Sequence, residues 1–312
     1  MFTSSLVVID VGVQGGIGPR WEHLGDFIEV HGFDALAEAI APLEALGQPK
    51  HHYYAMALGN EDGERELFVA PEPTATSFYP HGASRYGVDE RVSRSSGTRP
   101  VPIRRLDTLS AQGVFERADF IKIDCEGFEP EILKGGQALL REGVLAIEIE
   151  TNFNTSPVLP QSHFGAVCEQ LLPHGLTPFD LAFDRTPRAS FLARAQSLGI
   201  SEAVTVARPT TINALFYRDS PPLSADELLK RVAILEIYGM ADTAYDALMA
   251  GADLLAKDFP LQSVADLLVR GKIDRPVPIE FWIGLFQPRR KRCHMSLRLA
   301  ELHVRPETAK RY

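Results

Sequence analysis

Short apolar runs that alternate with helical or loop segments constrain this 312-residue chain most strongly. The runs are apolar at consecutive positions, as in "SLVVID", which is typical of strands covered on both faces. An amphipathic pattern over 35–47, ended by Gly47, predicts a helix after the second run. Strands that alternate with helices indicate an α/β fold with a mostly parallel sheet and helices on both faces. The expected strands are 5–10, 27–34, 51–60, 119–124, 144–150, 176–183 and 211–218.

The last two runs, 176–183 and 211–218, have no strong helix between them beyond 184–207. We therefore expect them to form an antiparallel pair at one edge of the sheet. Residues 61–104 are not a simple crossover, because "ERELFVAP" predicts an extra strand. The long polar stretch after it is expected to be functional or mobile, since loops of that length are uncommon inside compact domains.

The character of the chain changes at Ser220. "SPPLSADELLKRVAILEIYG" opens with two prolines and a serine cap, and its leucines and valine then follow at helical spacing. Two further helical patterns come after it, without a convincing fixed-length repeat. We predict a domain over 1–219 and a helical C-terminal region over 220–312. That region is expected to mediate oligomerisation or partner binding.

Charge and composition exclude several classes of protein. A net charge of −9 argues against general binding of nucleic acid. No apolar run approaches the roughly 20 residues of a membrane helix, so we expect no membrane span. The three cysteines are far apart and show neither a disulfide framework nor metal-ligand spacing, which favours a cytoplasmic location.

The first segment with chemical meaning is the glycine-rich loop in "VVIDVGVQGGIGPRW". Gly12, Gly15 and Gly16 follow a strand and would let the backbone approach a ligand without a Cβ clash. The loop matches neither G-x-G-x-x-G nor a P-loop. The negative charge of Asp10 suits a cationic ligand such as S-adenosylmethionine, which carries an ammonium and a sulfonium, better than a pyrophosphate. The alternative is a tight turn that binds nothing.

Asp34 ends the second expected strand, about 20 residues beyond the glycines. An acid at this place can accept hydrogen bonds from both ribose hydroxyls of an adenosine ligand. It could also cap the helix that begins near Ala35. The two roles are compatible.

Two further acids, Asp124 and Glu126, follow the strand in "FIKIDCEGFEPEILKGG". Ligands of open α/β sheets bind beyond the carboxyl ends of the strands, so both acids are expected to face the ligand crevice. They could hold the amino group of a cofactor, take a proton from a substrate hydroxyl, or bind a divalent metal. No spacing specifically indicates a metal. Glu129, beside Pro130, is assigned to the start of the following helix.

Glu148 and Glu150 lie on one face of the strand in "IEIETNFN", because strand side chains alternate. Acids on a central strand are rarely unpaired, so we expect Glu148 to pair with Arg104 or Arg105. Glu150 is nearer the ligand end and is a candidate contact of substrate or metal.

The histidines give weaker signals. His81, within the long polar loop, is a candidate catalytic residue, and His163 follows another polar loop. His51 and His52 open a strand and are expected at the surface. The sequence holds no G-x-S-x-G motif and no histidine–cysteine cluster of the kind that binds zinc.

Taken together, these segments resemble the FkbM-type S-adenosylmethionine-dependent methyltransferases. The matching pieces occur in the order of that family over roughly residues 5–219. They are "VVIDVGVQGG", "EVHGFDA", "ALGNEDGERELFV", "RRLDTL", "FIKIDCEGFEPEILKGG", "LAIEIE" and "INALFYRD". The resemblance implies a Rossmann-like class I methyltransferase, with a seven-stranded sheet whose last strand is antiparallel. It also implies methyl transfer to a hydroxyl of a sugar, glycan or polyketide-type metabolite.

Roles carried over by the resemblance concern the ligand crevice. Asp34 would bind the ribose and Leu58 would lie beside the adenine. Asp124 and Glu126 would lie near the transferring methyl group. The cofactor loop would comprise Asp10, Gly12, Gly15 and Gly16.

Two positions depart from the usual pattern of the family. Val13-Gln14 and a double glycine replace an Ala-Asn-like pair, and Asp34-Ala35 replaces Glu-Pro. The shorter Asp34 carboxylate must approach the ribose more closely.

Two other functions remain open from the sequence. One is an NAD-type oxidoreductase or epimerase, which the missing G-x-G-x-x-G and the presence of Asp10 disfavour. The other is a non-catalytic binding module, in which a degenerate methyltransferase fold supports the helical region. The acids at 10, 34, 124 and 126 argue against that reading.

Overall fold

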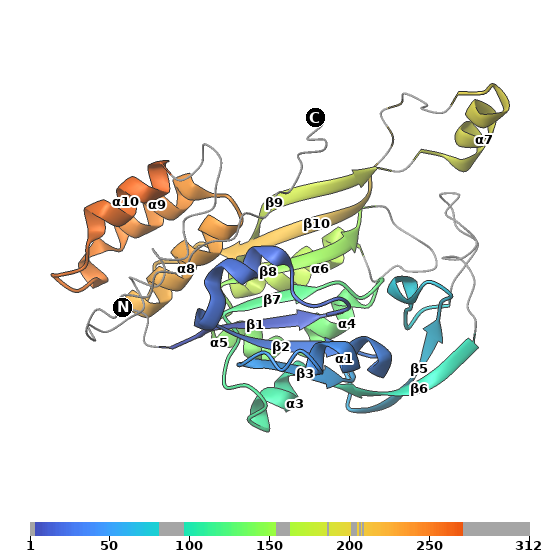
Figure 1. The fold of residues 1–312 in the computed structure, drawn as a ribbon, viewed down its shortest axis with the longest axis horizontal. Helices are drawn as coiled ribbons and strands as arrows, with labels where there is room; N and C mark the ends of the chain where they lie inside the picture. Colours follow the sequence, from blue (N-terminus) through green and yellow to red (C-terminus); the bar gives the residue numbers. More distant parts are fainter. Residues whose placement is uncertain are drawn as a thin grey trace.

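The computed structural model describes residues 4–80, 97–153, 163–185, 187–200, 205, 207 and 209–270. A seven-stranded sheet forms the centre of this part of the molecule (Figure 1). In spatial order the strands are β3 (His51–Ala55), β2 (Ile28–Asp34), β1 (Leu6–Val11), β7 (Phe120–Ile123), β8 (Ala146–Asn152), β10 (Pro209–Arg218) and β9 (Leu176–Arg185).

Strand β10 runs against both of its neighbours, β8 and β9, whereas the other neighbouring pairs of the sheet are parallel. The expected antiparallel pair at the edge is therefore confirmed. The predicted α/β class is confirmed as well, with a seven-stranded, mostly parallel sheet. All six residues of β1 are buried, which explains why its sequence lacks the polar–apolar alternation of a half-exposed strand.

A second, three-stranded sheet lies beside the main one, in the order β4 (Ala57–Leu58), β6 (Gly97–Arg104) and β5 (Gly63–Val69). Strand β5 is the extra strand predicted from "ERELFVAP". Strand β6 was not predicted, because Pro100 and Pro102 interrupt its sequence and prolines argue against a strand. Its two prolines stand opposite Glu66 and Glu64 of β5.

Helices cover one face of the main sheet with a single large hydrophobic core. Leu106, Ile132, Leu139 and Val167 contribute to this core from four different helices. The helices are α3 (Leu106–Ala111), α4 (Glu129–Lys134), α5 (Gln137–Glu142) and α6 (Phe164–Leu171).

The opposite face carries α1 (Ala37–Glu44), the 3-10 segment η1 (Pro19–Phe27) and α8 (Ala225–Ile237). Trp21 of η1 packs edge-on against Phe120 of β7, with ring centroids 4.7 Å apart. The helices α9 (Ala241–Ala250) and α10 (Leu261–Arg270) extend this layer on the left of Figure 1. The predicted helical character of the C-terminal region is thus present up to residue 270.

Shorter elements complete the described part of the chain. Helix α7 (Ala189–Ser197) lies beyond the ends of β9 and β10 at the upper right of Figure 1. The remaining 3-10 turns are η2 (Pro73–Ala75), η3 (Leu172–His174) and η4 (Ala252–Leu254). Within the described ranges, no helix is long and apolar enough to cross a membrane.

A buried ion pair fastens α8 to the sheet. The Lys230 ammonium lies 2.9 Å from Oδ2 of Asp119 and 3.4 Å from Oδ2 of Asp226. Asp119 also accepts a hydrogen bond of 2.8 Å from the backbone N–H of Val7, next to the start of β1. Because the Lys230 side chain is almost fully buried, these carboxylates offset the cost of removing its ammonium from water.

Candidate functional site

The carboxyl ends of β1, β2, β7 and β8 meet at one edge of the main sheet, where the loops after β1 and β7 touch. The N–H of Gly12 donates to the carbonyl oxygen of Phe33, and the N–H of Asp124 donates to that of Val11, at 2.9 and 3.0 Å. Gly12 has a φ of +85°, and a Cβ there would lie 2.0 Å from the Asp124 carbonyl oxygen. Only glycine therefore fits between the two loops.

A cavity of about 270 Å³ opens at this edge. Its walls combine backbone of the β1 loop, apolar side chains from β2 to β5, and acids from β7 and β8. Six of the residues expected in the site line it, namely Gly12, Asp34, Leu58, Asp124, Glu126 and Glu150. Other lining residues include Val11, Phe33, Met56, Ser77, Phe78, Lys122 and Phe128.

The remaining expected site residues lie elsewhere. Asp10 is buried next to the cavity and is not part of its wall. Gly15 and Gly16 form the turn beyond Gly12, both with positive φ, and are also outside the wall. His81 lies outside the described residues.

Asp34 shapes the turn before α1 and does not cap the helix, whose N-cap residue is Leu36 and has no side-chain cap hydrogen bond. Its Oδ1 accepts a hydrogen bond of 2.8 Å from the backbone N–H of Leu36. Its carboxylate also faces the cavity. Burial raises the pKa of Asp34, and the Leu36 hydrogen bond opposes that rise. The second carboxylate oxygen is left for a ligand.

A row of charged side chains crosses β1, β7 and β8 beside the cavity. Asp10, Lys122 and Glu148 occupy directly opposite positions on these strands. The Lys122 ammonium lies 3.8 Å from Oδ1 of Asp10 and 3.4 Å from Oδ2 of Asp124. Burial disfavours the charge of Lys122, but Asp10 and Asp124 outweigh burial and raise its pKa.

Asp10 is the most buried acid of this row. Burial raises its pKa to about 6, Lys122 lowers it, and Asp124 and Glu148 raise it further. The Oδ1 atom is buried, and no described residue donates a hydrogen bond to it. A cationic ligand near the β1 loop would compensate this carboxylate, as the sequence suggested.

The prediction that Glu148 pairs with Arg104 or Arg105 was wrong. Its carboxylate accepts a hydrogen bond from the Tyr238 hydroxyl and lies 4.0 Å from Arg20. Arg104 and Arg105 belong to β6 and the turn after it, where Arg104 donates to the carbonyl oxygen of Gly63. The sequence could not show this, because η1 and the end of α8 reach Glu148 only through the fold.

The loop after β7 is held by Glu129. Its buried Oε1 accepts hydrogen bonds of 3.0 Å from the N–H groups of Cys125 and Gly127. Glu126, between them, adopts a φ of +51°, which is rare for a residue with a side chain. Glu129 thus supports the shape of the loop, and Glu126 and Asp124 project from it toward the cavity.

Two acids at the cavity have strongly raised pKa values. The pKa of Glu126 is raised to about 8, mainly because its carboxyl group is shielded from solvent, and further by the charges of Glu150 and Asp124. The residue as a whole is nevertheless exposed. Burial, Asp124 and Glu129 raise the pKa of Glu150 to about 7. A carboxyl with such a pKa can accept a proton near neutral pH and release it again.

Lys122 is the residue of the cavity that the sequence reasoning missed. Its signal was present, because a lysine inside the short apolar strand "FIKID" is rare unless it has a charged partner. His163 has a structural place instead, since its Nδ1 accepts a hydrogen bond of 3.1 Å from the N–H of Gly165 and caps α6.

The strand order and the reversed β10 are those of the class I S-adenosylmethionine-dependent methyltransferase fold. Residues 22–173 match the family model of the methyltransferase FkbM domain. The resemblance seen in the sequence is thereby confirmed. No curated protein matches the chain significantly.

Several solved structures are similar to the chain. An FkbM methyltransferase from Methylobacillus flagellatus is 12% identical, with a TM-score of 0.35, and the match covers 68% of this chain and 44% of that one. A TehB-like S-adenosylmethionine-dependent methyltransferase from Corynebacterium glutamicum is 12% identical, with a TM-score of 0.30, over 69% and 82% of the two chains.

A third similar structure is the 1,6-didemethyltoxoflavin-N1-methyltransferase from Burkholderia thailandensis, with 1,6-didemethyltoxoflavin and S-adenosylhomocysteine bound. It is 13% identical, with a TM-score of 0.31, over 70% of this chain and 72% of that one. The co-substrate S-adenosylmethionine follows from the family, and the acidic crevice beside a close backbone approach at Gly12 fits its positive charges.

Proposed function

We propose that the protein transfers the methyl group of S-adenosylmethionine to a hydroxyl oxygen of a sugar, glycan or polyketide-type metabolite. One observation carries this proposal. Glu126 and Glu150 line the same cavity as Asp34, and their pKa values of about 8 and about 7 suit a general base that works near neutral pH.

The acceptor oxygen attacks the methyl carbon in line with the departing sulfur. The bond between carbon and sulfur breaks as the bond between carbon and oxygen forms, and the sulfonium becomes a neutral thioether. The hydroxyl proton passes to the carboxylate of Glu150 or Glu126. The protein contributes mainly by holding the two reactants in this geometry.

Each acid of the site has a proposed role in binding. Asp34 accepts hydrogen bonds from the ribose hydroxyls, and Leu58 lies against the adenine. Asp10 and Asp124 compensate the positive charges of the co-substrate. The turn formed by Gly12, Gly15 and Gly16 lets the backbone approach it closely. Lys122 spans the two carboxylates and keeps them from repelling one another.

The proposal also covers the organisation of the chain. We assign methyl transfer to residues 1–219, and assembly or partner binding to residues 220–312. Cys125 and Cys168 are free thiols, which is consistent with a reducing cytoplasmic setting.

The test uses S-adenosylmethionine labelled with carbon-13 in its methyl group, together with panels of sugars, glycans and polyketide-type alcohols. A methyl ether product, identified by the chemical shift of the labelled carbon, would support the proposal. Its rate should rise with pH up to about 7–8, and Glu150→Gln or Glu126→Gln should abolish that rise. Labelled product on nitrogen or sulfur only would overturn the assignment to oxygen. The non-catalytic alternative predicts no product with any acceptor or extract.

A further inference from the structure

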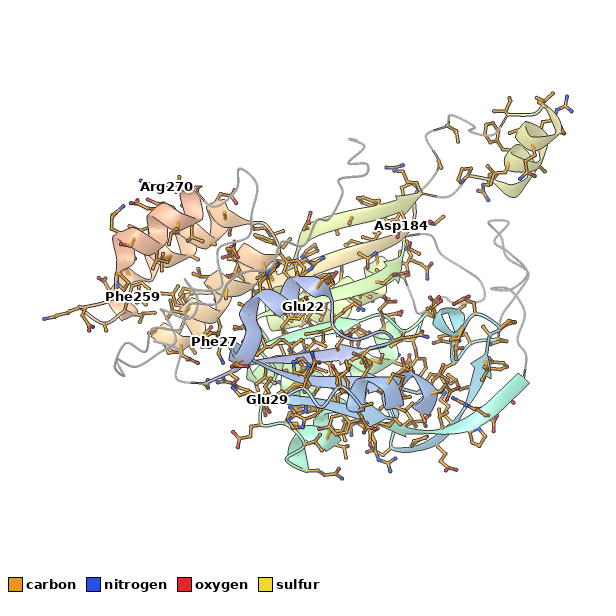
Figure 2. All side chains as sticks on the ribbon, in the orientation of Figure 1. Glu22, Phe27, Glu29, Asp184, Phe259 and Arg270 are labelled. Carbon is orange, nitrogen blue, oxygen red and sulfur yellow. The ribbon has the colours of Figure 1, made fainter. Side chains whose placement is uncertain are left out.

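A second group of ligating side chains lies on β2 and β3. Glu29, His31 and His52 place a carboxylate oxygen and two imidazole nitrogens within 4.8 Å of one another. His31 and His52 are directly opposite in the parallel pairing of the two strands, and Glu29 is on the same face of β2 as His31. In Figure 2, Glu29 lies near Phe27, where β2 begins. The cavity lies at the other end of β2, where Asp34 lines it. Asp34 is three residues beyond His31, which corresponds to roughly 10 Å along an extended strand.

We propose that Glu29, His31 and His52 bind one zinc-type divalent ion, which joins the edge strand β3 to β2. Two histidines and one carboxylate, with a fourth position left to water, form a common zinc ligand set.

The distances are close to those that a bound ion requires. Ligands about 2.1 Å from a tetrahedral ion are about 3.4 Å from one another. Nε2 of His31 and Oε1 of Glu29 are already 3.1 Å apart. His52 is exposed at the edge of the sheet, so a side-chain rotation can bring its nitrogen closer. Glu29 is partly exposed, and the ion therefore has a path from solvent.

The surroundings of His31 favour its use as a ligand. Its Nδ1 lies 3.2 Å from the Tyr54 hydroxyl, which can either donate or accept a hydrogen bond. When Nδ1–H donates to the Tyr54 hydroxyl, the lone pair of Nε2 is left for the ion. Metal-bound histidines commonly donate their other ring N–H to such a partner, which fixes the tautomer. Phe115 packs edge-on against the imidazole, with ring centroids 5.5 Å apart, and keeps it buried.

The test uses the full chain after treatment with a chelator and removal of that chelator. Zinc chloride is then titrated into it by calorimetry, and cobalt(II) is added separately to record the visible absorption of a tetrahedral site. We expect one saturable site that His52→Ala and Glu29→Gln weaken by at least about tenfold. The matched control is His51→Ala, because the His51 ring is directed to Tyr53, with Nδ1 3.2 Å from its hydroxyl.

Zinc should raise the melting temperature of the wild type and of His51→Ala, and it should raise that of His52→Ala much less. His51→Ala and His52→Ala both leave the buried His31 unchanged, so we expect both variants to fold and the comparison between them to report on zinc binding. Failure of the wild type to take up zinc would overturn the proposal. Equal uptake by the wild type and His52→Ala would do so too, because the ion would then be held elsewhere among the nine histidines and three cysteines of the chain.

Discussion

The backbone of Gly12 touches the backbone of Asp124 so closely that a Cβ on Gly12 would lie 2.0 Å from the Asp124 carbonyl oxygen. This contact joins the loop after β1 to the loop after β7, and both loops line the cavity. The shape of the site therefore depends on a glycine at position 12 for two reasons, namely its positive φ and the lack of space.

The substitution Gly12→Ala should consequently be much more harmful than Gly15→Ala. Both glycines have nearly equal positive φ values, +85° and +82°, but nothing lies within 4 Å of a Cβ at Gly15. Gly15→Ala should cost about 1–2 kcal/mol of unfolding free energy from backbone strain alone. Gly12→Ala adds the clash and should cost roughly 2–5 kcal/mol. Urea denaturation of both variants checks the difference, and equal costs would contradict the close approach.

Removing the Asp34 carboxylate should weaken the binding of S-adenosylhomocysteine. A charged group that accepts hydrogen bonds contributes about 1.5–3 kcal/mol, so Asp34→Ala should raise the Kd by about 10- to 100-fold. Asp34→Asn keeps an oxygen for the Leu36 N–H and so separates the loss of this turn hydrogen bond from the loss of ligand binding. Glu44→Ala, on the exposed side of α1, is the matched control and should bind like the wild type. Unchanged affinity in Asp34→Ala would remove this residue from the site.

The acids of the site should make the unliganded protein less stable as the pH rises. The folded pKa values of Asp10, Glu150 and Glu126 are about 6, 7 and 8, against ordinary values of 3.8, 4.5 and 4.5. The folded state therefore binds more protons than the unfolded state, and their contribution is present below about pH 4 and is lost by about pH 8.

The lowered pKa of buried His31 acts in the opposite direction, so a comparison with variants is needed. Glu150→Gln should flatten the decline between about pH 4.5 and 7, and Asp10→Asn should flatten it between about pH 4 and 6. Unfolding free energies measured across this range check the prediction. Identical pH slopes in the wild type and both variants would show that these carboxyls are not perturbed.

Lys230 should be essential for the stability of the packing between α8 and the sheet. Lys230→Met removes the buried ammonium from Asp119 and leaves the Arg117 guanidinium 3.6 Å from its Oδ2, so the loss should be near the lower end of the about 3–5 kcal/mol that breaking a buried pair costs. Adding Asp119→Asn should recover part of the loss. Lys257→Met changes an exposed lysine and should leave the unfolding free energy within about 0.5 kcal/mol of the wild type. A loss below 1 kcal/mol in Lys230→Met would mean that the pair adds little.

The sequence predicted the main sheet well because its strands are buried on both faces and so read as uninterrupted apolar runs. It also predicted which acids meet at the cavity, since the carboxyl ends of parallel strands share one edge. It failed where a partner comes from a distant segment, as with Arg20 and Tyr238 beside Glu148. The group of Glu29, His31 and His52 was missed for the same reason. His52 lies beside His31 only because of the register in which β2 and β3 pair, and the sequence does not show that register.

We propose the crevice at Gly12, Asp34 and Asp124 as the binding site of S-adenosylmethionine. Calorimetric titration of the full chain with S-adenosylhomocysteine tests it most directly. The structure predicts saturable binding of one ligand per chain, weakened in both Asp34→Ala and Asp124→Ala. No binding at high micromolar ligand, or equal binding by the wild type and both variants, would contradict the claim.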